Sequence, residues 1–282
     1  MIKAGITCCS NGLKRAYTHK MPELESVLIK SGFDFEYSNH IYEKENVFGG
    51  TVTERAAALM EFYKNDEIDV IFDISGGDIA NGILPYLDYD VIAKTNKLFF
   101  GYSDLTTVIN AIYAKTGKKS VLYNVRNLVH LERCGIRYEA EKIIGDRKEQ
   151  SSLYDVKYNF IQGTMMQGVV VGGNIRCFLK LAGTQYMPDM NGKILLLESN
   201  SGTVAKMETY LCQMKQLGIF DKISGIILGT FTEMESELCI PSIDTLVKRI
   251  VSKEMPIAVT SEIGHGRDSK AILIGEKLHI KD

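Results

Sequence analysis

The chain has 282 residues, of which 45% are hydrophobic and 24% charged, with five prolines and a formal net charge of −2. This composition is typical of one large or two ordinary globular domains and excludes an intrinsically disordered chain. Because the charge is near neutral and Lys and Arg are spread along the sequence, nucleic acid and anionic membranes are not expected as partners. No apolar run reaches the roughly 18 residues of a membrane span, and no signal peptide is recognisable, so a cytoplasmic protein is expected.

The first half alternates strand and helix patterns. Thr51 and Glu54 have the spacing of a capping box at the start of one predicted helix, and the continuous apolar run at 68–74 predicts a strand buried on both faces. This alternation predicts a parallel sheet with helices on both sides and ligands at the carboxyl ends of its strands. The predicted strands are residues 2–7, 33–37, 68–74 and 97–101, and the predicted helices are 22–31, 54–64 and 105–117.

The pattern weakens over residues 126–163, which we interpret as a linker with some local structure. Beyond the linker, the sequence indicates a smaller, β-rich domain of mixed type. Its predicted strands are 164–171, 193–197, 225–229, 257–259 and 270–274, and its predicted helices are 175–181 and 204–217. The predicted organisation is therefore an α/β protein with an N-terminal domain at 1–125 and a C-terminal domain at 164–282.

The segment KLFFGYSDLTT (97–107) places Ser103 at a corner between a strand and a helix. A serine at such a corner can project its hydroxyl into solvent, close to unpaired helix N–H groups that stabilise an oxyanion. Ser103 is therefore a candidate nucleophile. The alternative is that Ser103 or Asp104 is an ordinary helix N-cap.

A serine nucleophile needs a base and an acid that orients the base. His265 lies between Gly264 and Gly266, which allow a sharp bend and close approach of a substrate to the imidazole. Glu198 ends a predicted apolar strand, where a carboxylate needs partners or an opening onto a cleft. The alternatives are a turn histidine and an ordinary glutamate at a strand end.

The loop Ser75-Gly76-Gly77-Asp78 follows the predicted strand at 68–74. Its backbone N–H groups, together with that of Asp104, would form a two-donor oxyanion hole. The alternatives are a tight turn and a phosphate cradle, but the chain lacks the glycine-rich patterns of nucleotide-binding loops. The six cysteines form no CxxC pair and the five histidines are scattered, so no metal site is predicted.

Three segments, 83–117, 170–199 and the IGHG at 263–266, resemble the LD-carboxypeptidases. This serine peptidase family includes muramoyltetrapeptide carboxypeptidases and microcin C self-immunity peptidases. The resemblance implies a homodimer that needs no metal or other cofactor and hydrolyses the amide bond beside the C-terminal residue of a small peptide. The implied site comprises nucleophile Ser103, base His265, acid Glu198, oxyanion donors Gly77 and Asp104, and substrate contacts Gly76, Ser75 and Tyr102.

The chain departs from the usual family pattern near the implied site. Ser75 stands where the family usually has arginine, and the sequence VLYNVRN (121–127) stands where a Gly-Pro is commoner. The further acidic residue often found after the position of Glu198 is absent from SNSGTVAKM. These departures leave the substrate open between a cell-wall muropeptide and a peptide–nucleotide antibiotic of the microcin C type. A peptide-binding module without turnover is a third interpretation.

Overall fold

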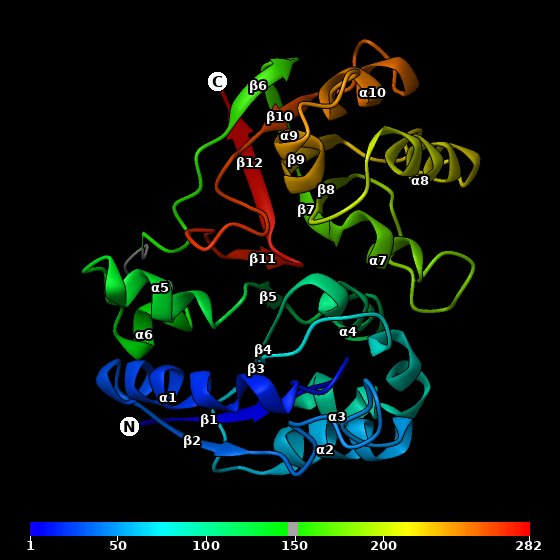
Figure 1. The fold of residues 1–282 in the computed structure, drawn as a ribbon. Helices are drawn as coiled ribbons and strands as arrows, with labels where there is room; N and C mark the ends of the chain where they lie inside the picture. The colour runs from blue at the N-terminus through cyan, green and yellow to red at the C-terminus, as the bar shows by residue number, and fades with distance from the viewer. Residues whose placement is uncertain (146–151) are drawn as a thin grey trace.

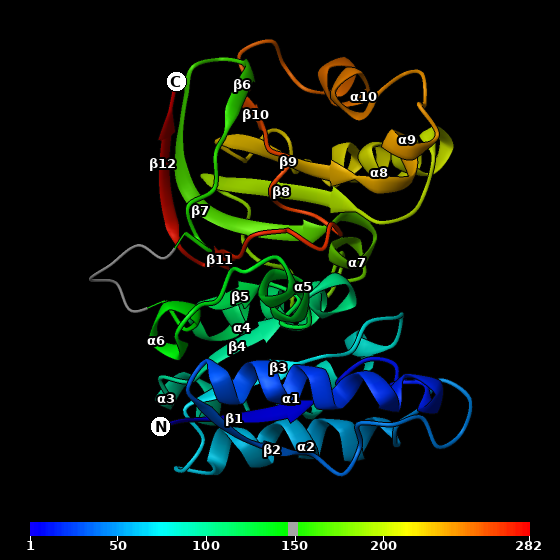
Figure 2. The ribbon, with the colours of Figure 1, turned by 60° about the vertical axis from the view of Figure 1, so that its left-hand side comes forward.

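The computed structural model describes residues 1–145 and 152–282. Two six-stranded sheets lie one above the other, with helix α4 (Thr106–Thr116) between them (Figures 1 and 2). The chain is an α/β protein with a mixed, mostly parallel N-terminal sheet and a curled, β-rich C-terminal sheet. The predicted fold class is therefore confirmed.

The first sheet has the strand order β11-β5-β4-β3-β1-β2, and β11 alone runs antiparallel to its neighbour. Its strands are β1 (Ile2–Thr7), β2 (Phe33–Tyr37), β3 (Val70–Asp73), β4 (Leu98–Gly101), β5 (Ser120–Leu122) and β11 (Ile272–Ile274). One face is covered by α1 (Met21–Lys30), α5 (Asn127–Arg133) and α6 (Ala140–Ile143), and the other by α2 (Val52–Lys64), α3 (Tyr89–Lys94) and α4.

Local sequence signals explain these elements. Val70 and Phe72 of β3 pack on the α1 side while Ile71 packs on the α2 side, so the continuous apolar run is buried on both faces as predicted. At the start of α2, the Thr51 hydroxyl accepts from Glu54 N at 3.2 Å, and a Glu54 carboxylate oxygen accepts from Thr51 N at 2.8 Å. The predicted capping box is therefore confirmed. Short 3₁₀ turns η1 (Arg15–Lys20), η2 (Ala80–Tyr86) and η3 (Ser103–Leu105) connect the larger elements.

The second sheet has the order β12-β7-β8-β9-β10-β6, with four parallel central strands and antiparallel strands at both edges. Its strands are β6 (Asn159–Gln162), β7 (Met165–Asn174), β8 (Lys193–Ser199), β9 (Gly225–Phe231), β10 (Ile257–Val259) and β12 (Lys277–Lys281). The accompanying helices are α7 (Ile175–Leu179), α8 (Val204–Gln216), α9 (Thr232–Ser236) and α10 (Ile243–Ile250).

The predicted boundaries at 125 and 164 do not coincide with the division between the sheets. Helices α5 and α6 of the predicted linker pack on the first sheet, and β6 forms an edge of the second sheet. Strand β11, predicted as part of the C-terminal domain, pairs with β5 in the first sheet. One hydrophobic cluster also continues from Val108 of α4 to Leu195 of β8, so the two halves share a core.

Among the described residues, no helix combines the length and the apolar character needed to cross a bilayer.

Candidate active site

The backbone turns sharply between β4 and α4. After Tyr102, which is extended, Ser103 adopts a left-handed conformation with φ of 54°. A non-glycine residue in this region is uncommon, costs about 1–3 kcal/mol, and is found preferentially at functional sites. A methyl group on Gly101 would lie 2.6 Å from the Leu105 side chain, so the tight corner also needs this glycine. The strained corner holds Ser103 half-buried at the carboxyl end of β4.

The structure rejects the helix-cap interpretation of this corner. Neither η3 nor α4 begins with a side-chain cap. The fully buried Asp104 carboxylate instead accepts from Ser10 Oγ at 2.6 Å, Ala80 N at 2.8 Å and Lys180 Nζ at 2.6 Å. Its side chain therefore anchors the corner, because a buried carboxylate is stable only when it is paired and hydrogen-bonded.

Helix α4 is fastened to the second sheet, which fixes the corner relative to that sheet. The Asn110 amide donates to Gly172 O at 2.8 Å and accepts from Gly172 N at 2.8 Å. Asn174 N donates to Thr106 Oγ1 at 3.1 Å. A methyl group on Gly173 would lie 2.8 Å from this hydroxyl, so the close contact requires glycine there. The last residues of β7 thereby hold the helix that follows Ser103.

Glu198 lies on β8 directly beside Asn174 of β7. Its carboxylate is fully buried, and Oε2 lies 2.7 Å from His265 Nδ1. His265 follows Gly264, where a methyl group would collide with Thr230 Oγ1. With Nδ1 directed at the carboxylate, the imidazole has Nε2 available for another partner. The structure thus brings together the predicted acid and the predicted histidine, which are 67 residues apart in sequence.

The Tyr102 side chain completes this group. Its hydroxyl donates to Glu198 Oε2 at 3.1 Å and lies 3.1 Å from His265 Nδ1, and the tyrosine and imidazole ring centroids are 4.7 Å apart. Burial, followed by the nearby Glu198 charge, raises the pKa of Tyr102 well above its ordinary value, so the hydroxyl remains a donor. Sequence reasoning predicted Tyr102 as a substrate contact and missed its contacts with Glu198 and His265. The only sequence signal for these contacts was the position of Tyr102 directly before Ser103.

Among the residues that the structure describes, no hydrogen bond joins Ser103 to His265. Catalytic hydrogen bonds are often long in structures without a ligand and tighten when substrate binds. Ser103 and His265 nevertheless lie in the same region, because the residue before Ser103 is Tyr102 and the Tyr102 ring contacts the imidazole.

The loop 75–78 is held from both halves of the chain. Asn11 N donates to Gly76 O at 3.2 Å, and Gly77 has a φ of 133°, with no room for a methyl group beside the Asn11 side chain. From the second half, Arg176 donates to Gly77 O at 3.2 Å and pairs with Asp78. These contacts fix the backbone of the loop, as is required of a backbone N–H group that stabilises an oxyanion.

Ser75 faces the protein interior. Its hydroxyl donates to Asp73 Oδ1 at 2.5 Å and accepts from Ser10 N at 3.0 Å. Burial raises the pKa of the Asp73 carboxyl, and the hydrogen bonds from Ser75 and Cys9 oppose that shift. The Ser75 hydroxyl is therefore hydrogen-bonded to the buried Asp73 carboxylate inside the protein.

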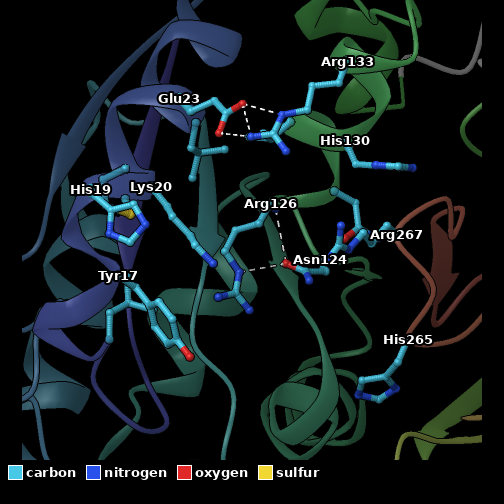
Figure 3. Close-up of a pocket in the computed structure, with 15 residues that line it drawn as sticks. Tyr17, His19, Lys20, Glu23, Asn124, Arg126, His130, Arg133, His265 and Arg267 are labelled. Atoms are coloured by element: carbon cyan, nitrogen blue, oxygen red, sulfur yellow. Dashed lines mark hydrogen bonds and ion pairs between the residues drawn. The ribbon is translucent and has the colours of Figure 1, made fainter.

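A cavity of about 600 Å³ opens beside His265. Figure 3 shows that it lies between the η1–α1 segment, the segment that follows β5, and the loop carrying His265 and Arg267. Its lining includes four cationic side chains, three histidines and one carboxylate: Lys20, Arg126, Arg133, Arg267, His19, His130, His265 and Glu23. Sequence reasoning missed this cluster, because its members come from three separate segments of a chain whose total charge is near zero.

Three buried cysteines, Cys8, Cys9 and Cys177, are poor candidate nucleophiles. Cys177 lies beside Asp104, and burial together with that carboxylate raises the pKa of its thiol to about 12. Burial also raises the pKa values of Cys8 and Cys9. Within residues 1–145 and 152–282, no three His, Cys, Asp or Glu side chains are grouped as metal ligands.

Comparison with known proteins assigns both halves of the chain to one family. Residues 4–123 match the LD-carboxypeptidase N-terminal domain, and residues 167–280 match the LD-carboxypeptidase C-terminal domain. The Microcin C7 self-immunity protein MccF of Escherichia coli is 28% identical over 82% of this chain and 76% of its own length. The probable murein peptide carboxypeptidase of Bacillus subtilis is 26% identical over 87% of this chain and 79% of its own length.

Solved structures have the same fold. The MccF-like protein from Bacillus anthracis superposes with a TM-score of 0.83 at 24% identity, covering 100% of this chain and 94% of its own. The muramoyltetrapeptide carboxypeptidase from Oxalobacter formigenes gives a TM-score of 0.81 at 21% identity, covering 99% and 95%.

Proposed function

Since this chain belongs to the LD-carboxypeptidase family, we propose that it is a serine carboxypeptidase that releases the C-terminal residue of a small peptide through an acyl-enzyme. The observation that carries the proposal is the buried Glu198–His265 pair, joined by Tyr102 to the strained corner that presents Ser103. A carboxylate on Nδ1 orients the imidazole and stabilises the imidazolium that forms when a serine is deprotonated.

In the proposed mechanism, His265 Nε2 removes the Ser103 proton as the hydroxyl oxygen attacks the scissile carbonyl carbon. The oxyanion that forms accepts hydrogen bonds from the N–H groups of Asp104 and Gly77. His265 then protonates the leaving amine, which departs with the C-terminal residue. Water, activated by the same imidazole, releases the acyl group from Ser103.

The anchoring contacts support this division of roles. The Asp104 carboxylate is engaged by Ser10, Ala80 and Lys180, so the group offered to the oxyanion is the backbone N–H of this residue. The Gly76 carbonyl, which shares a peptide unit with the Gly77 N–H, accepts from Asn11 N, and the Gly77 carbonyl accepts from Arg176. Preorganised donors of this kind stabilise a transition state without reorganising during the reaction.

The substrate class proposed first is an L,D-muropeptide of cell-wall recycling, because two relatives are named murein peptide or murein tetrapeptide carboxypeptidases. The alternative is hydrolysis of a peptide–nucleotide antibiotic in self-immunity. It is favoured by the relative named Microcin C7 self-immunity protein MccF, because a solved structure of MccF contains aspartyl sulfamoyl adenosine.

A mass-spectrometric panel tests the proposal and separates these substrates. The purified protein is incubated with a tetrapeptide muropeptide ending in D-alanine, the same peptide ending in L-alanine, and aspartyl sulfamoyl adenosine. Loss of D-alanine alone supports the muropeptide assignment, and cleavage beside the sulfamoyl nucleoside supports the alternative. Binding without turnover of any of them, or turnover retained in Ser103→Ala, contradicts the serine peptidase proposal.

A further inference from the structure

Three cations in the cavity beside His265 form no ion pair within residues 1–145 and 152–282. Among these residues, the only acidic one that lines the cavity is Glu23, and its two oxygens accept from Arg133 Nε and Nη2 at 2.6 Å each. Lys20, Arg126 and Arg267 form no ion pair among the described residues. The described lining of the cavity therefore holds more cations than carboxylates, although the whole chain carries a net charge of −2.

The arrangement of these side chains favours an anion inside the cavity. Arg126 is oriented by Asn124, whose Oδ1 accepts from both the Nε and the backbone N of Arg126 at 3.3 Å. Figure 3 shows Arg126 and Lys20 among the side chains that line the cavity, and the Lys20 ammonium lies 4.7 Å from the centroid of the Tyr17 ring. Lys20 also immediately precedes Met21, the first residue of α1, so the positive end of a ten-residue helix adds to the field.

The position of the cavity identifies the part of the substrate that would occupy it. His265 lines the cavity, and in the proposed mechanism this imidazole delivers the proton to the leaving amine. The C-terminal residue of the substrate, which departs with this amine, would therefore bind next to the imidazole. A volume of about 600 Å³ and three cations without a described ion-pair partner exceed what one small residue with one terminal carboxylate requires.

We propose that Lys20, Arg126 and Arg267 form an anion-binding subsite that favours, over a neutral terminal residue such as D-alanine, a departing residue carrying a second anionic group in addition to its terminal carboxylate. This inference rests on the proposed function. Its ligand chemistry is a carboxylate or a phosphate on the side chain of the departing residue. Arg126 is its centre, because a guanidinium can donate two parallel hydrogen bonds to either oxyanion.

Two pairs of peptides that share one acyl portion test the subsite. The first pair ends in D-glutamate or its neutral isostere D-glutamine, and the second in phospho-D-serine or D-serine. The expected result is that kcat/KM for one or both anionic peptides exceeds that of the neutral counterpart by about 10- to 100-fold, the range for a charge-assisted hydrogen bond. The pair with the larger ratio distinguishes carboxylate from phosphate.

Arg126→Met should bring this ratio close to one, whereas Arg249→Met should preserve it. Arg249 is an exposed arginine on α10, outside the cavity, so its replacement matches the change in charge. Raised salt should also lower the ratio in the wild-type protein, because solvent ions screen the cations. A ratio near one in the wild-type protein, or an unchanged ratio in Arg126→Met, would overturn the proposal.

Binding measurements separate failure of the subsite from failure of the proposed function. Calorimetry on the Ser103→Ala variant compares the D-glutamate peptide with the D-glutamine peptide, without and with Arg126→Met. Selective, Arg126-dependent binding in a protein that hydrolyses nothing would retain the subsite and contradict the peptidase. Ser103-dependent hydrolysis of both peptides at equal rates would retain the peptidase and contradict the subsite.

Discussion

The Glu198 carboxylate lies 2.7 Å from His265 Nδ1 and has no solvent exposure. This contact joins the end of β8 to the loop after β10, at the place where Tyr102 reaches over from the first sheet. The acid and the base are therefore held by one sheet and the candidate nucleophile by the other. The contacts of α4 with Gly172 and Asn174 fix the position of the candidate nucleophile relative to the acid and the base.

Glu198→Gln should lower kcat by about 10³-fold or more while leaving the fold intact. The amide keeps the shape of the side chain but no longer compensates the positive charge that develops on the imidazole during attack. Steady-state kinetics with the best panel substrate, together with a thermal unfolding curve, measure both effects. Retention of more than a tenth of the wild-type kcat would contradict the role of Glu198.

Tyr102→Phe should lower kcat/KM by about 10-fold, the value of a hydrogen bond to a charged group. Without the tyrosine donor, Glu198 Oε2 keeps only its contact with His265 Nδ1, so the imidazole is oriented less precisely for attack. Steady-state kinetics should therefore show the loss in kcat more than in KM. Burial raises the pKa of Tyr102 itself, so its ionisation should cause no loss of wild-type activity up to about pH 10.

A matched variant controls for the loss of a buried hydroxyl. Tyr63→Phe removes a hydroxyl from a tyrosine of α2 that is 2% exposed and lies outside the candidate site. Its kcat/KM should match that of the wild type. An unchanged kcat/KM in Tyr102→Phe, or an equal loss in both variants, would refute the positioning role of Tyr102.

Lys180→Met should destabilise the protein by about 3–5 kcal/mol, because it leaves the buried Asp104 carboxylate without its cation. Urea unfolding measures the loss, and Lys222→Met, at an exposed lysine, is the control. The double variant Asp104→Asn/Lys180→Met should recover part of the loss, since no unpaired charge remains. If the single and double variants were equally unstable, lost packing and not the buried charge would be the cause.

Gly77→Ala should reduce kcat by about 10²–10³-fold, the usual cost of losing one oxyanion donor. The added methyl group meets the Asn11 side chain, and the φ of 133° is unfavourable for alanine. Gly76→Ala is the comparison, because a methyl group there meets no atom within 4 Å. A large loss in Gly76→Ala alone would instead indicate that the substrate packs against Gly76.

The sequence predicted those helices and strands whose apolar or capping pattern lies within a short stretch of neighbouring residues. The apolar runs of β3 and β8 and the capping box of α2 needed no knowledge of distant residues. Strand β11 has only three residues, and its partner β5 lies about 150 positions earlier in the chain, so no local signal assigns it to the first sheet. The same holds for β6, which is an edge strand within the predicted linker.

The candidate site shows the same division. Glu198 and His265 could be selected one by one, because each stands at the end of a predicted strand or beside glycines, and the resemblance joined them to Ser103. The orientation of the Tyr102 hydroxyl depends on the extended backbone before Ser103 and on the approach of the other sheet. The cavity cations depend on where three loops meet, which the near-neutral total charge conceals.

Fluorophosphonate labelling followed by peptide mapping tests the central claim most directly, because the probe reacts with a serine only where that serine is activated. The account predicts one phosphonyl adduct on Ser103 in the wild-type protein, a much slower reaction in Glu198→Gln, and no adduct in Ser103→Ala. An adduct on another serine, or hydrolysis retained by Ser103→Ala, would contradict it.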